Sequence, residues 1–258
     1  MSNPSSRITD YGPSDRVDAA DVARYDALGE AWWDPNGAMA PLHRLNPTRI
    51  RYIRDLIVRQ FDVAPDAALP LAGLSILDIG SGGGLLSEPL ARMGGRVTGI
   101  DPAPNNVAIA ARHAEENGVS VAYRATTAET LAEAGETFDV VLALEVVEHV
   151  PDPDAFVATA CALVRPGGIF VLSTLNRTAK SFALAIVGAE YVLRWLPRGT
   201  HDWNQFRTPD EIATPVRVAG LKILDRTGMV FDPLRNAWNL SRDTDVNYLL
   251  SAKRPAGP

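Results

Sequence analysis

The sequence predicts an α/β protein built on a mainly parallel sheet with helices on both faces. Between residues 75 and 174, short apolar runs typical of buried strands alternate with segments of helical periodicity. The first run, Ser75–Ile79, leads into a glycine-rich turn, and about 20 residues after the first glycine a second run ends in Asp101. A turn and an acid in this layout indicate a nucleotide-type cofactor site at one edge of the sheet.

Two N-terminal helices, within residues 19–72, are expected to precede the sheet and to close over it. Ala19–Ala31 carries a helical stripe, and Asn46 with Pro47 is expected to begin the second helix, with Asn46 as its cap. The predicted strands are Ser75–Ile79, Arg96–Ile100, Val119–Arg124, Phe138–Leu144 and Gly168–Thr174. The predicted helices between them are Leu85–Met93, Asn105–Asn117, Ala128–Glu133 and Asp154–Val164.

The C-terminal part has a different pattern, which indicates an antiparallel edge to the sheet. Its short runs, Leu221–Arg226, Gly228–Asp232 and Val246–Ala252, are most consistent with a pair of antiparallel edge strands. With the five strands above, we predict seven strands in all, mostly parallel. Thr208 and Glu211 form a capping box that begins a helix, which Pro215 is expected to bend or shorten. We expect residues 1–18 to be disordered and residues 19–258 to form a single domain.

Composition excludes several classes of protein. The net charge of −6 argues against broad nucleic-acid binding, which usually requires a basic excess. The single cysteine, Cys161, excludes an intrachain disulfide and is expected to be a small buried apolar residue. Met1–Ser14 is polar and resembles no signal peptide, and no uninterrupted apolar run reaches the roughly 18–20 residues of a membrane span. A soluble intracellular protein is therefore expected.

The spacing of the glycine turn distinguishes between cofactors. A dinucleotide turn requires G-x-G-x-x-G, whereas here the pattern is D-x-G-x-G-x-G, formed by Asp78, Gly80, Gly82 and Gly84. Asp78 could hold a ligand ammonium, and Asp101 could accept hydrogen bonds from ribose hydroxyls. A ligand with an amino acid at one end and a ribose at the other is S-adenosylmethionine. A nicotinamide-dependent dehydrogenase is the alternative, which the glycine spacing and Asp78 oppose.

A second group of polar residues follows the strand Phe138–Leu144. Glu145, Glu148 and His149 lie within one short turn and would share a face if that turn were helical. Two carboxylates and one imidazole could hold Mg²⁺ or Mn²⁺. His149 could instead act as a general base without a metal, because imidazole exchanges a proton near neutral pH, or it could be a buried structural residue. These three interpretations stay open at this point.

The segment 177–206 does not fit the simple alternation. It is strongly apolar from Lys180 to Leu196, and it is flanked by basic residues with Trp195 near one end. Those features are typical of a helix that lies in a membrane interface, and a core-facing helix or a substrate lid is the alternative.

The motifs quoted above, with V-T-G-I-D, F-D-V-V and L-V-R-P-G-G, resemble those of class I S-adenosylmethionine-dependent methyltransferases, which have a Rossmann-like fold. More specific strings resemble the bacterial O-methyltransferases of ubiquinone biosynthesis from about Asp21 to Lys253. These strings are Trp32–Asp34, Pro41–Pro47, Glu145–Pro153, Ser173–Arg177, Val187–Tyr191, Gly199–Asp202 and Asp245–Tyr248.

The resemblance implies roles for individual residues. Arg49 would close over the cofactor's carboxylate, Gly80 would bind its methionine part, and Asp101 its ribose. Gly82 of the glycine turn is a further candidate cofactor-binding residue. The backbone of Leu144 would line the pocket. Two further residues would lie near the adenine, Ala128 and Glu129. The acid–acid–histidine metal ligands of eukaryotic relatives match Glu145, Glu148 and His149, of which Glu145 and His149 are also the candidate catalytic residues.

The resemblance also implies a reaction and a location. The acceptor would be a ring hydroxyl of a polyprenylated demethylubiquinol or of a 2-polyprenyl-6-hydroxyphenol. Another lipid-tailed phenol and a non-catalytic membrane-associated scaffold are the alternatives. The expected cofactors are S-adenosylmethionine and, if the acid–acid–histidine set is used, Mg²⁺. The expected partners are an anionic membrane surface and other enzymes of ubiquinone biosynthesis, with the protein in the cytoplasm, peripheral to the inner membrane.

Overall fold

The computed structural model describes residues 17–64, 66–184 and 203–257. The predicted disordered N-terminus, residues 1–18, falls almost entirely outside these residues. Most of the predicted interface segment, residues 177–206, falls outside them too.

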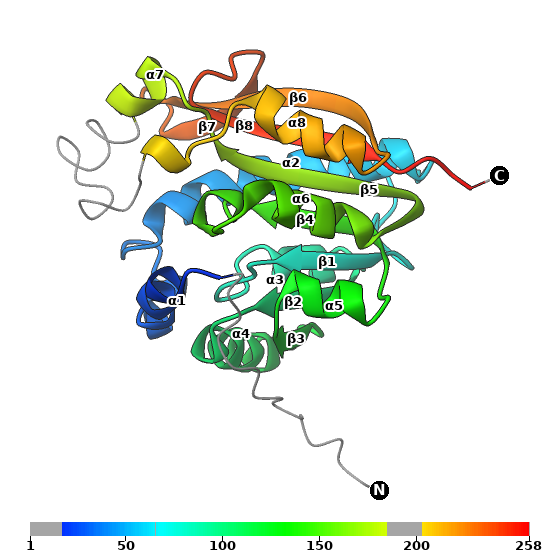
Figure 1. Cartoon of the computed structure of the whole chain (residues 1–258). Coiled ribbons are helices and arrows are strands. Elements are labelled where there is room, and N and C mark those ends of the chain that lie inside the picture. Colours follow the sequence, from blue (N-terminus) through cyan, green and yellow to red (C-terminus); the bar gives the residue numbers. More distant parts are fainter. Residues whose placement is uncertain (1–16, 65, 185–202, 258) are drawn as a thin grey trace, which may run out of the picture.

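The described residues form one eight-stranded sheet in the order β3-β2-β1-β4-β5-β8-β6-β7 (Figure 1). The first five strands pair in parallel, and β8, β6 and β7 continue the sheet with antiparallel pairing. This confirms the α/β class and the antiparallel edge. The strands are β1 (Ser75–Ile79), β2 (Arg96–Asp101), β3 (Ala122–Ala125), β4 (Phe138–Leu144), β5 (Val164–Leu175), β6 (Lys222–Asp232), β7 (Ala237–Ser241) and β8 (Asn247–Lys253).

The predicted count of seven strands was one too low because β7 was missed, whereas the runs Leu221–Arg226 and Gly228–Asp232 are both parts of β6. The strand β7 is short and only partly buried, so its sequence has no clear period of two. Gly228 lies inside β6, where a Cβ would come within 1.6 Å of the Asp243 carbonyl oxygen. Glycine is needed at this point because another segment of backbone passes against the strand. It does not mark a break between two strands.

The helices that precede the sheet differ from the prediction in their bounds. The helix α1 is Ala19–Asp26, followed by η1 (Gly29–Trp33), a short 3-10 turn. The helix α2 (Ala40–Gln60) begins six residues before Asn46, so Asn46 is not its cap and Pro47 lies inside it. Proline inside a helix costs about 3 kcal/mol. Apolar side chains that α2 buries on both sides of Pro47 offset this cost, among them Leu45, Ile53 and Leu56.

The remaining helices connect the strands largely as predicted. They are α3 (Ser87–Arg92), α4 (Pro104–Glu116), α5 (Ala128–Glu133), η2 (Val147–His149), α6 (Pro153–Ala162), α7 (Ala179–Ser181), η4 (Trp203–Gln205) and α8 (Pro209–Val218). The capping box before α8 is confirmed, because Thr208 and Glu211 exchange side-chain to backbone hydrogen bonds. Pro215 lies inside α8 and does not end it.

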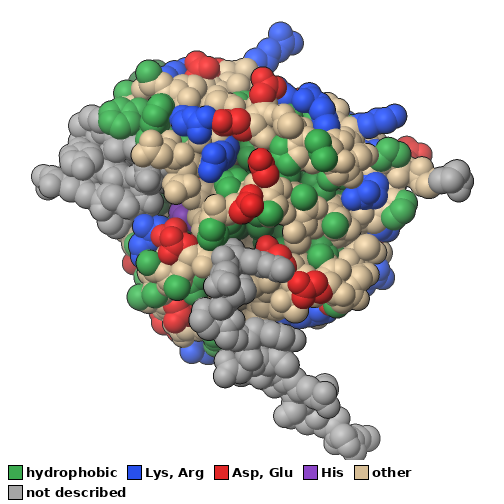
Figure 2. All heavy atoms as spheres, viewed as in Figure 1, with side chains coloured by type: hydrophobic (Ala, Val, Ile, Leu, Met, Phe, Trp, Pro, Cys, Tyr) green, Lys and Arg blue, Asp and Glu red, His purple; other side chains and the backbone are tan. Residues whose placement is uncertain are grey.

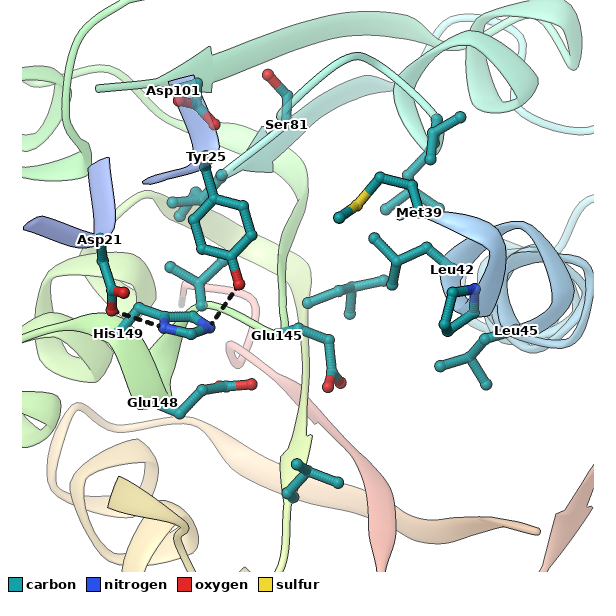
Figure 3. Close-up of a pocket in the computed structure, with 18 of the residues that line it drawn as sticks. Asp21, Tyr25, Met39, Leu42, Leu45, Ser81, Asp101, Glu145, Glu148 and His149 are labelled. Atoms are coloured by element: carbon teal, nitrogen blue, oxygen red, sulfur yellow. Dashed lines mark hydrogen bonds and ion pairs between the residues drawn. The ribbon is translucent and has the colours of Figure 1, made fainter. Parts of the chain in front are cut away.

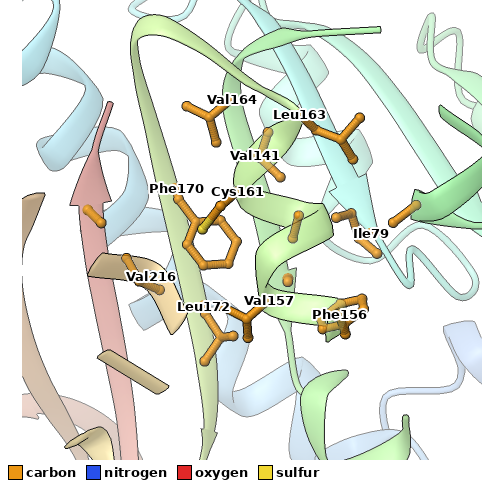
Figure 4. Close-up of a cluster of buried hydrophobic side chains, with 14 of the residues drawn as sticks. Ile79, Val141, Phe156, Val157, Cys161, Leu163, Val164, Phe170, Leu172 and Val216 are labelled. Carbon is orange, nitrogen blue, oxygen red and sulfur yellow. The ribbon is translucent and has the colours of Figure 1, made fainter. Parts of the chain in front are cut away.

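Two apolar clusters lie on opposite faces of the sheet. One packs α5, α6 and α8 against it, and the other packs α2 and α3. In the first cluster, Phe156, Val157 and Cys161 of α6 meet β4 and β5 (Figure 4). Cys161 is fully buried, as predicted, and burial raises the pKa of its thiol to about 12.

One face of the described surface is mixed in charge. On the face in Figure 2, Lys and Arg side chains are interspersed with Asp and Glu side chains, and the coloured atoms show no continuous basic patch. Within the described ranges, no helix has the length and apolar character needed to cross a bilayer.

Candidate active site

A cavity of about 690 Å³ opens at the carboxyl ends of the parallel strands. That volume suits a small-molecule site, and this edge is where α/β sheets bind ligands. The register explains why the polar residues meet there, since Ile79 pairs with both Ile100 and Ala143. The cavity wall contains these predicted site residues: Arg49, Asp78, Gly80, Asp101, Ala128, Glu129, Leu144, Glu145, Glu148 and His149.

The glycine turn is held against β2. The amides of Gly80 and Ser81 both donate to the Ile100 carbonyl oxygen, at 2.8 and 2.9 Å. Gly80 and Gly82 have positive φ angles of 71° and 51°, which favour glycine. A Cβ on Gly82 would lie 2.5 Å from the Trp32 ring, so η1 packs directly on the turn. Gly82 was predicted as a cofactor residue, and its amide donates to Asp101.

Asp101 is buried and connects the turn to the next helix. Its carboxylate accepts hydrogen bonds from the amides of Gly82 and Ala103, both at 2.9 Å, and from the side-chain amide of Asn106 at 3.2 Å. Burial raises the pKa of Asp101, and these hydrogen bonds oppose that shift. The Asn106 side-chain oxygen accepts from the Trp32 indole at 2.9 Å. The acid therefore holds the turn, and the predicted contact with ribose would be an additional role.

Asp78 lies beneath the turn, where its carboxylate accepts a hydrogen bond from the Ser87 hydroxyl at 2.6 Å. Burial, assisted by the nearby Asp101, raises the pKa of Asp78 to about 7 against the opposing Ser87 hydrogen bond. A buried acid with a raised pKa gains from a cationic partner. A ligand ammonium in the cavity would supply one.

Replacing Asp78 by asparagine should change how the cofactor-free protein responds to pH. With its pKa raised to about 7, folded Asp78 keeps a proton that unfolded Asp78 has lost, so the unfolding free energy falls as pH rises from about 4 to about 7. Asp78→Asn removes this loss, which can reach a few kcal/mol. Urea unfolding at about pH 5 and about pH 8 measures it. The unfolding free energy of the variant should exceed that of the parent by more at about pH 8 than at about pH 5. An equal difference at both pH values would contradict the raised pKa of Asp78.

Arg49, in the middle of α2, is almost fully buried. One guanidinium nitrogen lies 2.6 Å from Glu145 Oε1, and its Nε has no hydrogen-bond partner among the described residues. Burial lowers the pKa of Arg49, and the carboxylates of Glu145 and Glu148 oppose the shift. The hydroxyls of Ser81 and Thr126, also in the cavity wall, lack hydrogen-bond partners within the described ranges too. These donors fit a ligand that carries a carboxylate and hydroxyls.

The tip of β4 is bound tightly to β5. Glu145 has a φ of 56°, an uncommon conformation for a residue other than glycine that often marks a functional site. Its Oε1 accepts from the Ser173 hydroxyl at 2.7 Å, and Glu148 Oε2 accepts from Thr174 at 2.9 Å. Burial raises the pKa of Glu148 to about 7, and the neighbouring charge of Glu145 adds to that shift.

His149 faces the N-terminal helix α1 (Figure 3). Its Nδ1 lies 2.9 Å from Asp21 Oδ2, and its Nε2 lies 3.3 Å from the Tyr25 hydroxyl. Sequence reasoning missed both residues of α1, because this helix carries none of the motifs from which the site was predicted. Their spacing of four residues, which places them on one helical face, could have indicated a shared partner.

The predicted metal site does not assemble in this structure. The turn after β4 is a 3-10 turn that starts at Val147, so Glu145 lies outside it. Glu145 pairs with Arg49, Glu148 with Thr174 and His149 with Asp21. Across the described residues, no group of three or more His, Cys, Asp or Glu side chains has an arrangement that could hold an ion. These three side chains therefore do not fit a metal in this arrangement.

Comparison with known proteins distinguishes S-adenosylmethionine from a nicotinamide cofactor. Residues 77–172 match the family model described as a methyltransferase domain. A ubiquinone biosynthesis O-methyltransferase of Methylobacterium nodulans is 59% identical over 244 residues, which cover 95% of this chain and 97% of that protein. One from Azorhizobium caulinodans is 60% identical over 237 residues, covering 92% and 94%.

The chain belongs to the ubiquinone biosynthesis O-methyltransferases. Its resemblance to class I methyltransferases is thereby confirmed, and it is an S-adenosylmethionine-dependent methyltransferase.

Solved structures confirm the Rossmann-like fold of this methyltransferase. Magnesium protoporphyrin IX methyltransferase from Synechocystis, solved with S-adenosylhomocysteine, aligns with a TM-score of 0.61 at 20% identity, covering 92% of this chain and 94% of that one. An N-methyltransferase from Bradyrhizobium japonicum, also solved with S-adenosylhomocysteine, aligns with a TM-score of 0.56 at 18% identity, covering 92% and 97%.

Proposed function

We propose that this methyltransferase transfers a methyl group to a ring hydroxyl of polyprenylated demethylubiquinol and of 2-polyprenyl-6-hydroxyphenol. One observation carries the proposal. A single cavity joins the polar cofactor residues to an apolar wall formed by the end of β5, the start of the segment after α7, and the β6–β7 hairpin. That wall suits an aromatic ring with an isoprenoid tail. Its side chains include Leu175, Leu184, Met229, Phe231 and Trp238.

The polar end of the cavity would bind S-adenosylmethionine. Arg49 Nε would bind the carboxylate, Asp78 the ammonium and Asp101 the ribose, while Ala128, Glu129 and the Leu144 backbone would lie near the adenine. The bound cofactor supplies a methyl group already activated on sulfonium, so the protein's main task is to place the acceptor oxygen in line with the bond that breaks.

The acceptor hydroxyl must also lose its proton. A phenol has a pKa of about 10, so a base near neutral pH assists its attack. His149 would accept this proton at Nε2, the nitrogen that faces Tyr25 in the structure. Glu145 is a less suitable base, because its Oε1 already forms an ion pair with Arg49 and accepts from the Ser173 hydroxyl. We propose that Glu145 contributes by holding Arg49 in place.

An activity assay tests this function. The protein, S-adenosylmethionine and a short-tailed demethylubiquinol analogue should yield S-adenosylhomocysteine and the methylated ring, measured by mass spectrometry. The assay is run after chelation and again with Mg²⁺ added back, so that a dependence on metal is also measured. Absence of methyl transfer under both conditions would overturn the proposal, and calorimetric binding of NADH without binding of S-adenosylhomocysteine would favour a dehydrogenase.

We also propose that the protein meets an anionic membrane surface beside this cavity, so that the substrate tail stays in lipid. Phe182 and Leu184 support this, because both are exposed where the apolar segment begins and Leu184 also lines the cavity. The described basic residues support it less, since Arg177 pairs with Glu211, and Lys180 with Asp243.

Replacing Phe182 and Leu184 together by aspartate should weaken binding to vesicles of anionic phospholipid by about tenfold or more. Burial of each large apolar side chain contributes roughly 1.5–3 kcal/mol, and the new acids repel the lipid. Vesicle co-sedimentation measures the change. The matched control is Val218→Asp, an exposed apolar residue at the far end of α8. Equal binding by the double variant and the control would contradict the proposal.

A further inference from the structure

We propose that Asp21 is a positioning residue, which holds the His149 ring so that Nε2 faces the hydroxyl of the methyl acceptor. This inference rests on the proposed function, in which His149 takes the proton. It assigns a part in the reaction to helix α1, which carries none of the glycine-turn or strand-tip motifs. The residues lie 128 positions apart in the chain and meet because α1 forms part of the cavity wall.

The contact between the two side chains defines where the histidine carries its hydrogen. An ionised carboxylate can only accept a hydrogen bond, so His149 Nδ1, 2.9 Å from Asp21 Oδ2, is the donor. In a neutral imidazole Nε2 is then the acceptor. The same arrangement of acid, imidazole and hydroxyl recurs in catalytic triads, in which the acid fixes both the tautomer and the ring orientation of the histidine.

Asp21 is itself held in place. Its other carboxylate oxygen, Oδ1, forms an ion pair with Arg24 at 2.9 Å. Its backbone amide donates to the side chain of Asp18, the cap of α1, at 3.2 Å. Since the side chains of both Asp21 and His149 are half-buried, the contact is partly shielded from water. A fixed acid of this kind holds a ring more firmly than a mobile surface residue would.

Tyr25 occupies the position that the acceptor would take. Its hydroxyl lies 3.3 Å from His149 Nε2, and burial raises the pKa of this phenol to about 12, so it stays protonated and donates. A substrate phenol would present the same group to the same nitrogen. In the reaction the O–H bond breaks and its proton goes to Nε2, the oxygen forms a bond to the methyl carbon, and the carbon–sulfur electron pair stays on sulfur. The imidazolium that results is stabilised by Asp21.

A purely structural role for Asp21 is less consistent with how α1 docks. Asp26, on the same helix, already attaches α1 to the start of α4. Its side chain accepts from the Asn105 amide at 3.0 Å, and its carbonyl oxygen accepts from the Asn105 side chain at 2.8 Å. The following turn is anchored by Trp32, through Asn106. Helix α1 therefore has attachments that do not involve His149.

The experiment compares three variants of the full-length protein: Asp21→Asn, Asp21→Glu and the matched control Asp26→Asn, which makes the same change on the same helix. With saturating S-adenosylmethionine and the short-tailed demethylubiquinol analogue, Asp21→Asn should lower kcat by about 10- to 100-fold, with KM for the analogue changed by less than about threefold. Asp21→Glu should restore part of the loss. Asp26→Asn should keep the parental kcat.

Two measurements separate positioning from folding and from failure of the proposed function. Calorimetric Kd values for S-adenosylhomocysteine should agree between Asp21→Asn and the parent, which shows an intact cofactor site. Nitrogen-15 NMR of labelled histidine should find parental His149 protonated at Nδ1, with protonation at Nε2 increasing in Asp21→Asn. This readout needs no turnover, so it tests the inference even if the parent methylates nothing, an outcome that would overturn the proposed function instead.

A parental His149 that carries its hydrogen on Nε2 would overturn the inference. So would Asp21→Asn with parental kcat, or a loss of kcat in Asp26→Asn as large as that in Asp21→Asn. A changed tautomer together with the kcat loss and its partial recovery in Asp21→Glu would support it.

Discussion

Replacing His149 by glutamine is expected to lower kcat for methyl transfer by about 10²- to 10⁴-fold, the usual contribution of a positioned general base. Glutamine has a similar shape and can still hydrogen-bond to Asp21 and Tyr25, but its amide does not take up a proton near neutral pH. The measurement is the initial rate with saturating S-adenosylmethionine and the short-tailed quinol analogue. The Kd for S-adenosylhomocysteine should stay near the parental value.

A second histidine provides the matched control. His113 stacks on Trp33 with ring centroids 3.4 Å apart, and its Nδ1 lies 2.7 Å from Glu88. It does not line the cavity, so His113→Gln should affect the unfolding midpoint more than kcat. If His149→Gln keeps more than about a tenth of the parental kcat, His149 is not the base.

Replacing Arg49 by methionine should raise the Kd for S-adenosylhomocysteine by about 10- to 100-fold, because a hydrogen bond to a charged group contributes roughly 1.5–3 kcal/mol. The change removes the buried donor at Nε and leaves Glu145 without its cationic partner. Removing one partner of a buried ion pair also costs about 3–5 kcal/mol of stability, reduced here because Glu145 is partly exposed. Calorimetric titration and urea unfolding measure the two effects separately.

Two companion variants sharpen this prediction. Arg49→Lys keeps the charge but loses the planar, forked geometry, so its affinity should fall between those of the parent and Arg49→Met. Arg51→Met removes an exposed arginine from the same helix and should leave the Kd unchanged. A parental Kd in Arg49→Met would show that the cofactor's carboxylate binds elsewhere.

The parallel half of the sheet and the cofactor end of the cavity could be predicted because their signals are local. Strands that are buried on both faces appear as short apolar runs, and a glycine turn between Asp78 and Gly84 needs only a few consecutive residues to be recognised. Parallel pairing then brings the ends of these strands together at one edge, so Asp78 and Asp101 had to lie near each other.

The predicted helix and strand bounds were wrong where packing between distant segments outweighs the local preference of the residues for helix or strand. Asn46 and Pro47 have the residue types of a helix start, yet α2 begins at Ala40, since the apolar residues before and after Pro47 pack together on the sheet. The strand β7 pairs with β6, and the Trp238 carbonyl oxygen accepts from Thr48 of α2 at 2.8 Å. Neither contact leaves a clear pattern in the sequence of Ala237–Ser241.

The sequence by itself determined the fold class, the S-adenosylmethionine cofactor and the predicted site residues that line the cavity, but not Asp21 or Tyr25 of α1. Only the tertiary structure decided how those residues are paired. It placed Arg49 against Glu145 and Asp21 against His149, and so converted a predicted metal triad into two separate ion pairs. The physical reason is that a motif specifies the chemistry of its side chains, whereas the partner of each charged group is set by which distant segment packs beside it and shields it from water.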